Sequence, residues 1–283
     1  MTPQQLQEFK SWFDRYVAGF YADDDYVNSN LKLKEDHSRR VCEEMLYLAG
    51  ALNLTENDTL IAETIAILHD IGRFKQFAEY NTYNDARSTN HCRLGVEILR
   101  ETKILSSLPE NDRLTIEKAI NLHGVKTLPP ALAEPDLRFC RLIRDADKLD
   151  VFYVAIGYYE SCRHDPSSLM LELEFPDQPV CTPEVVDAVM SEQAIDYTAL
   201  QTLNDMILCQ LGWVYDINFA PALRRIKEKA YLETLITFLP RTEEVARVRE
   251  KVLTYTDSRL RHNASHRTAA RRTSSYNHLT PEG

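Results

Sequence analysis

The sequence predicts an all-α protein. Only eight of the 283 residues are glycine, and long stretches place apolar residues three and four positions apart. That spacing is the repeat of a helix with one buried face. Apolar residues make up 44% of the chain, which is enough for a hydrophobic core.

The helices can be placed in order along the chain, and three stretches interrupt them. We expect helices at residues 4–20, 34–49 and 56–70, then from 91, from 112 to 123, and over 141–150, followed by 183–196, 198–213, 219–238 and 242–259. A polar and aromatic loop without clear periodicity separates residues 76 and 90, and loops of this length are often functional. Three prolines mark a linker near residue 130. Between residues 165 and 183 apolar and polar residues alternate, which indicates a short strand or an extended arm.

This order suggests a division of the chain. We expect residues 1–160 to form one domain and residues 161–258 a helical extension that packs on it. The helices of the extension carry no histidine, and we interpret them as packing helices or as a surface for homodimerisation. Residues 259–283 are polar, with several arginines and serines, and are predicted to be a disordered basic tail.

Charge and cysteine content exclude several classes of protein. The net charge of −10 argues against non-specific binding of nucleic acid. The six cysteines are scattered singly, which is typical of reduced thiols rather than a disulfide framework. No run of about 20 apolar residues could span a membrane, and the N-terminus lacks the pattern of a signal peptide. We therefore expect a cytoplasmic protein.

The most informative stretch is the apolar helical run that ends in His69 and Asp70. Both side chains can bind metal, and neighbouring positions on a helix let them approach one point from the same turn. A buried imidazole beside a buried carboxylate is costly unless both are satisfied, and a divalent cation satisfies both. Gly72 is predicted to end this helix in the left-handed conformation.

Further imidazole and carboxylate groups fall on predicted inward faces. His37 and His123 lie on buried helical stripes, and His91 begins the helix after the long loop. Asp147 shares a stripe with apolar residues, whereas Asp145 fits a surface ion-pair pattern. Any one of these histidines could be an ordinary buried residue, but together the groups indicate a metal site suited to Fe, Mn, Zn or Ni.

Three segments resemble the HD-domain superfamily of metal-dependent hydrolases. They are residues 34–41 (KEDHSRRV), 68–74 (LHDIGRF) and 144–150 (RDADKLD). The resemblance implies an all-α HD-domain bundle, here with additional C-terminal helices, in which one metal is held by His37, His69, Asp70 and Asp147. Asp145 is the rival to Asp147 if the alignment of the last segment is shifted.

The spacing of His91 and His123 is similar to that of two-metal HD subfamilies such as the HD-GYP phosphodiesterases. That similarity implies a binuclear centre bridged by Asp70, with Fe or Mn favoured and Mg, Zn or Ni as alternatives. The Gly-Tyr-Pro segment is missing and Arg73 stands where those proteins carry lysine, so cyclic di-GMP is not implied as substrate.

The resemblance implies hydrolysis of a phosphate ester or phosphoanhydride by a metal-activated water. Asp70 would take part in catalysis, and Arg73 and Lys148 are the expected phosphate contacts. The partner would be a small phosphorylated, nucleotide-like substrate. Two alternatives stay open: a mixed-valent di-iron oxygenase, similar to myo-inositol oxygenase-like proteins, and a ligand-sensing module with a structural metal.

Overall fold

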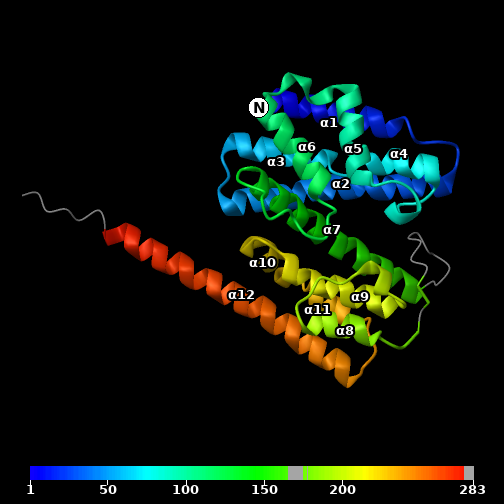
Figure 1. Cartoon of the computed structure of the whole chain (residues 1–283), viewed down its shortest axis with the longest axis vertical. Helices are drawn as coiled ribbons and strands as arrows, with labels where there is room; N and C mark the ends of the chain where they lie inside the picture. Colours follow the sequence, from blue (N-terminus) through cyan, green and yellow to red (C-terminus); the bar gives the residue numbers. More distant parts are fainter. Residues whose placement is uncertain (165–174, 177, 277–283) are drawn as a thin grey trace, which may run out of the picture. The chain divides into compact units, whose positions relative to one another are not determined.

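Helices account for all the regular structure that is described. The computed structural model describes residues 1–164, 175–176 and 178–276, and the side chains of residues 162–164 and 263–276 are not described. Within that part of the chain no strand occurs, so the all-α prediction is confirmed (Figure 1). The chain separates into two compact units, Met1–Glu174 and Phe175–Gly283. The alternating stretch predicted at 165–183 falls mostly outside the described residues.

The first unit is a bundle in which every helix except α4 (Ile71–Tyr80) corresponds to a helix expected from the sequence. Its helices are α1 (Pro3–Ala18), α2 (Asp25–Leu52), α3 (Glu56–Leu68), α4, α5 (His91–Thr102), α6 (Glu110–Leu122) and α7 (Asp136–His164). Polar caps begin several of them: the Asp24 side chain accepts from the Val27 amide, Thr55 from Asp58, and Asn90 from Arg93. These caps satisfy backbone donors that have no partner within the helix.

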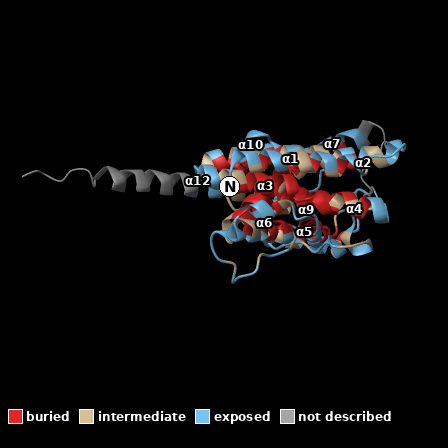
Figure 2. Ribbon diagram, turned by 90° about the horizontal axis from the view of Figure 1, so that it is seen from above, coloured by how far each residue is buried: buried red, intermediate tan, exposed pale blue. Residues whose placement is uncertain are grey.

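Helix α3 lies at the centre of the first unit. It packs against α1, α2, α6 and α7, and every residue from Ile61 to Asp70 is buried. Figure 2 shows the buried part of this helix in red. A helix that is apolar all round is stable only when neighbours cover it on all sides. The polar pair His69–Asp70 at its end is therefore carried into the interior.

Two boundaries differ from the sequence prediction. Helix α2 begins at Asp25, nine residues before the expected start at 34, because Asp24 caps it and Leu31 and His37 continue its buried face. Helix α4 runs to Tyr80, so the loop predicted from residue 76 begins only at Asn81. Residues 85–87 of that loop form a 3₁₀ turn.

The second unit contains the remaining helices. They are α8 (Pro183–Met190), α9 (Leu203–Gly212), α10 (Ala220–Glu228), α11 (Tyr231–Ile236) and α12 (Glu243–Tyr276). The single helix predicted at 219–238 is two helices, because Ala230 between them has a left-handed backbone with φ 51°. The last helix extends to Tyr276 instead of ending near residue 259, so it continues into the segment for which a disordered tail was predicted.

Asp205 organises the start of α9 in the second unit. It is fully buried, and its carboxylate accepts hydrogen bonds from the Thr182 amide and hydroxyl and from the amides of Gln201 and Thr202. Burial alone would raise the pKa of this carboxyl, but the four donors outweigh burial and lower it. They stabilise the charged form.

We expect Asp205→Asn to lower the free energy of unfolding by about 2–3 kcal/mol near pH 7, since hydrogen bonds to a charged group are lost. The pKa of Asp205 is lower in the folded than in the unfolded state. The loss in the free energy of unfolding should therefore be largest above pH ~4 and shrink as the pH falls further. Urea unfolding at several pH values measures it. The exposed Asp187→Asn serves as control, and a difference independent of pH would contradict the assignment.

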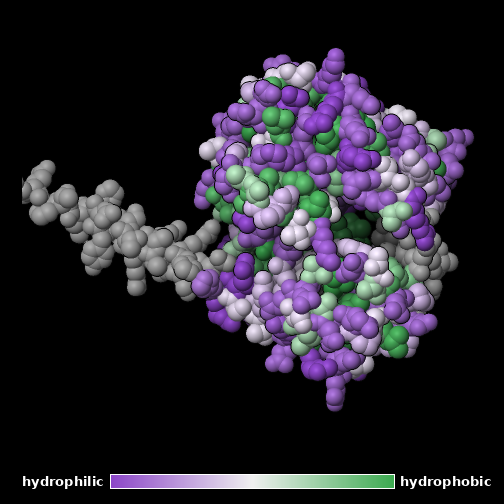
Figure 3. Space-filling view, viewed as in Figure 1, coloured by the Kyte–Doolittle hydropathy of each residue, from purple (hydrophilic) through white to green (hydrophobic). Residues whose placement is uncertain are grey.

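Figure 3 shows one face dominated by hydrophilic side chains with scattered apolar ones. Across the described residues, no helix combines the length and apolar character that crossing a membrane requires.

Candidate metal centre

The chain turns sharply at the end of α3, and this turn presents Asp70. His69 still has helical dihedral angles, whereas Asp70 has φ −101° and ψ 16° and precedes α4. The Asp70 side chain makes no capping hydrogen bond to α4. Both of its oxygens are therefore free of the helix end and point among histidines from other helices.

Four histidines meet around Asp70 as two pairs. The Nε2 atoms of His37 and His69 lie 3.3 Å apart, and those of His91 and His123 lie 3.2 Å apart. All four side chains are at least 90% buried. They come from α2, the end of α3, the start of α5 and the end of α6, so residues distant in sequence converge at one point.

The Asp70 carboxylate lies between the two pairs, with one oxygen toward each. Oδ2 is 3.6 and 3.7 Å from the Nε2 atoms of His37 and His69. Oδ1 is 3.5 and 3.6 Å from those of His91 and His123. This is the arrangement of a carboxylate able to bridge two ions.

Asp147 completes the group on the side of the first pair. Its Oδ1 is 3.2 Å from His37 Nε2 and 3.9 Å from His69 Nε2, and its side chain is 25% exposed. The centre is therefore open toward solvent at Asp147, while the histidines are enclosed. Asp145, in contrast, is fully buried. Its predicted surface ion-pair position was wrong, because α7 is packed against α2, α3 and α6.

Each histidine is held by its Nδ1 atom. His37 Nδ1 lies 2.7 Å from Asp150, His91 Nδ1 lies 2.7 Å from Asp85, and His69 and His123 face the carbonyl oxygens of Ala66 and Ile120 at 2.8 and 2.7 Å. Carboxylate and carbonyl oxygens only accept, so each Nδ1 carries the proton and donates. The lone pair of a neutral ring is then on Nε2, the atom directed at the centre.

This donor set fits divalent cations. Two Nε2 lone pairs that face each other repel unless a proton or a cation lies between them. Nitrogen ligands about 2.1 Å from one ion lie roughly 3.0–3.4 Å apart, which matches both pairs. Imidazole and carboxylate donors together suit first-row transition metals. His37–His69–Asp70, His69–His123–Asp147 and His91–Cys92–His123 are each close enough to share an ion.

The pKa values reflect the balance between burial and the charged groups that lie close together in the centre. Burial opposes protonation of His37, but the Asp147 and Asp150 carboxylates outweigh it and raise its pKa. The pKa of His123 is raised well above its ordinary value against burial, with Cys92 and Asp70 as the causes. Burial lowers the pKa of His69 to about 4. Despite burial, Lys34 and His69 hold the pKa of Asp70 well below the usual range.

Lys34, Arg73 and Lys148 differ in the contacts that they make around the centre. Lys34 Nζ is 2.9 Å from Asp70 Oδ2, although no role was predicted for it. Arg73 Nη1 donates to Asp85, Gln76 and the Tyr83 carbonyl, and its Nε lies 3.6 Å from Asp70 Oδ1. Lys148 Nζ donates to the Arg144 carbonyl within α7 at 3.5 Å, a contact that does not direct it to the centre.

Sequence reasoning also missed residues that orient the histidines. Asp150, which holds His37, is itself held by two hydrogen bonds from Arg40. Asp85 receives hydrogen bonds from Arg73 and Gln76 as well as His91. A carboxylate behind a metal-binding histidine is a common arrangement. The position of Asp150 on the face of Asp147, one turn away, was the only available signal.

Arg144 was likewise missed. It is 95% buried and donates to the carbonyls of His123, Val125 and Lys126 beyond the end of α6. A cation that binds the last carbonyls of a helix is stabilised by the helix dipole. Arg144 thereby fixes the backbone that carries His123.

Gly72 has a role different from the one predicted. It lies inside α4 and its φ is not positive, so it does not end a helix. A Cβ atom there would be 2.2 Å from the His91 carbonyl oxygen and 2.8 Å from the Gly95 amide. Glycine is needed because α4 and α5 approach closely behind the centre.

We expect Gly72→Ala to destabilise the protein by about 2–3 kcal/mol, because backbone must move to admit the methyl group. It should also weaken metal binding by displacing His91. Thermal unfolding and metal titration measure both effects. Gly50→Ala in α2 is the matched control, since nothing lies within 4 Å of its added Cβ, and it should be neutral or stabilising by about 0.5–1 kcal/mol. Equal effects of both substitutions would refute the close-packing role.

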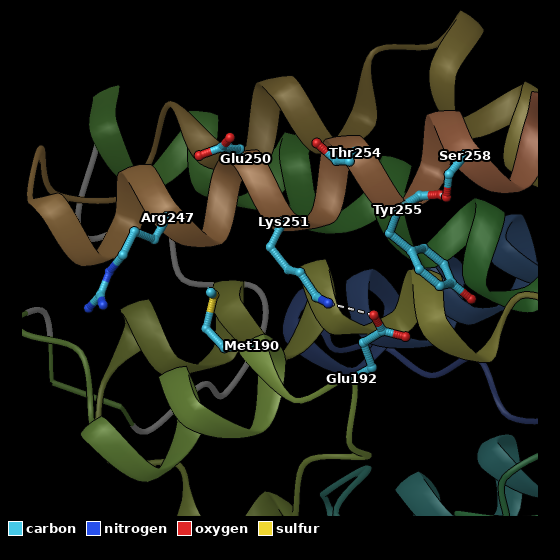
Figure 4. Close-up of a pocket in the computed structure, with 8 residues that line it drawn as sticks. All are labelled: Met190, Glu192, Arg247, Glu250, Lys251, Thr254, Tyr255 and Ser258. Atoms are coloured by element: carbon cyan, nitrogen blue, oxygen red, sulfur yellow. Dashed lines mark hydrogen bonds and ion pairs between the residues drawn. The ribbon is translucent and has the colours of Figure 1, made fainter.

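The second unit offers a different kind of cavity. An open pocket of about 450 Å³ lies beside α8 and α12, and Figure 4 shows Lys251 paired across it with Glu192 at 2.6 Å. Neither histidine nor cysteine is among the described residues that line it. Among the described residues, the groups that could hold a metal ion all lie in the first unit.

The fold and the site define a class: an all-α protein with a buried histidine–aspartate cluster able to hold divalent metal. Comparison of sequences gives the family. The family model described as HD domain matches residues 35–151, a range that contains all six predicted metal-ligating residues. Residues 35–151 therefore carry an HD domain, a domain whose members are generally metal-dependent hydrolases. No curated protein and no solved structure matches the chain.

Proposed function

We propose that the protein is a phosphohydrolase that uses two divalent metal ions to hydrolyse a phosphate ester or phosphoanhydride in a small, nucleotide-like substrate. The observation that carries the proposal is the placement of Asp70, with one oxygen toward each histidine pair. His37, His69 and Asp147 would complete one site, and His91 and His123 the other. Bound ions would polarise the phosphoryl group and supply a water of lowered pKa.

The residues around the centre support an anionic substrate. Lys34 and Arg73 both approach Asp70, and their side chains are 19% and 16% exposed. Once cations neutralise Asp70, the Lys34 ammonium is available to bind a phosphate oxygen at the open side near Asp147. Arg73 uses Nη1 to fix the loop at residues 83–85, so it also positions the wall of the substrate site. Lys34 is thus a further candidate for phosphate contact beside Arg73 and Lys148.

The test is phosphate release from a panel of nucleotides and phosphomonoesters with Mn²⁺, Fe²⁺ or no added metal. We expect turnover that needs metal, is abolished by a chelator and falls to background in His69→Ala. His262→Ala, an exposed histidine of the second unit, should retain full activity.

Metal analysis and oxygen consumption complete the experiment. Two ions per chain with phosphate release support the proposal. Two iron ions with O₂ consumption and no phosphate release would replace it with the oxygenase alternative. Metal that binds without turnover of any panel member would favour the ligand-sensing module.

A further inference from the structure

The two halves of the centre differ in the groups that surround them. The half with His37 and His69 is completed by carboxylate oxygens of Asp70 and Asp147. The half with His91 and His123 also faces Asp70, but it has a thiol in place of the second carboxylate. Cys92 Sγ lies 3.3 Å from His91 Nε2 and 3.8 Å from His123 Nε2. No sequence motif singled out this cysteine.

We propose that Cys92 is a sulfur ligand of the His91–His123 half, which gives that half a preference for a thiophilic ion such as Zn²⁺ over Mn²⁺. The inference rests on the proposed binuclear centre and adds its metal selectivity. Thiolate is a soft donor that selects zinc over manganese and magnesium, whereas carboxylate oxygen suits the harder ions. The other half, with only nitrogen and oxygen donors, is then the one open to Mn²⁺.

The start of α5 explains how two adjacent residues reach one ion. Asn90 caps this helix and His91 is its first residue, so no preceding turn covers either side chain. His91 is directed by Asp85, and Cys92 is 98% buried beside it. Their donor atoms and His123 Nε2 lie within 4.8 Å of one another, close enough for one ion.

Space for the sulfur comes from Gly124. A Cβ atom at this position would lie 2.9 Å from Cys92 Sγ and 3.4 Å from His91 Cε1. Cys42, Cys140 and Cys209 are also buried thiols. Among the described cysteines, however, Cys92 alone belongs to a group that could hold a metal. The alternative is that the thiol only donates a weak hydrogen bond to an imidazole, which predicts no bond to metal.

Cobalt substitution distinguishes a sulfur ligand from a thiol that only donates a hydrogen bond. The full chain is stripped of metal and titrated with Co²⁺, whose bond to a thiolate gives an intense charge-transfer band in the near ultraviolet. We expect this band in the wild type and in Cys140→Ala, and its loss in Cys92→Ala and Cys92→Ser. In competition, the two Cys92 variants should bind Zn²⁺ at least ~10-fold more weakly, with Mn²⁺ binding at the other half little changed.

The outcomes separate the inference from the proposed function. Cobalt that binds at two equivalents without the band, or a band that persists in Cys92→Ala with native circular dichroism, overturns the sulfur ligand and leaves the binuclear centre in place. Failure of the wild type to bind cobalt, zinc or manganese overturns both.

Discussion

Asp70→Asn is expected to abolish phosphate release and to reduce bound metal from two ions per chain to less than one. The substitution keeps the shape of the side chain but removes its charge, and one amide cannot offer an anionic oxygen to each histidine pair. Loss of several kcal/mol of transition-state stabilisation corresponds to a rate decrease of at least about 10³-fold. Metal analysis of the purified variant, together with the phosphate assay, measures both effects.

Asp36→Asn is the matched control for this change. Asp36 lies one position before His37 but forms an exposed ion pair with Lys32, so its loss should alter neither metal content nor rate. A variant at Asp70 that still binds two ions with wild-type affinity would show that this carboxylate is not the bridge.

Asp85→Ala is expected to weaken the ion at the His91–His123 half by about 10–100-fold while the other ion is retained. Asp85 receives the Nδ1 hydrogen of His91 on both oxygens and ties the loop to Arg73 and Gln76. Removal of such an orienting carboxylate typically costs this much metal affinity. Isothermal titration should show one weakened and one unchanged site, and Glu79→Gln, an exposed carboxylate of α4, provides the control.

The contribution of the charged Asp85 carboxylate to the free energy of unfolding should depend on pH in a definite direction. Burial would raise the pKa of Asp85, but His91 and Arg73 outweigh burial and lower it to about 2. The folded pKa is below the unfolded one, so stabilisation by Asp85 is complete above pH ~4 and is lost only as the pH falls toward 2. Between pH 5 and 8 the difference in the free energy of unfolding between Asp85→Ala and the wild type should therefore stay constant. A difference that changed across this range would contradict the assignment.

The candidate site was largely accessible from the sequence because its main residues lie on periodic helices. Buried stripes placed His37, His123 and Asp147 on inward faces, and the structure brings His37 and His123 to Asp70 and Asp147 to His37. The supporting groups were not accessible in this way. Asp85 lies in a loop without periodicity, and Lys34 was not distinguished from the other charged residues that begin the predicted helix.

Asp145 and Gly72 show why local patterns failed elsewhere. Charges three and four residues away suggested a surface position for Asp145, but neighbouring helices cover that face of α7. Gly72 followed a helical run and resembled a C-terminal cap, but the requirement for glycine comes from α5, whose backbone nearly touches it. Both depend on contacts between segments distant in the chain.

The sequence by itself determined that this protein is helical, which faces of its helices are buried, and which imidazole and carboxylate groups those faces carry. These properties follow from the spacing of neighbours within one helix. Only the tertiary structure decided that the groups form two pairs joined by one aspartate, that Lys34 and Cys92 stand beside them, and that the centre opens at Asp147. Such features depend on distances between helices, and the packing of side chains across the whole unit sets those distances.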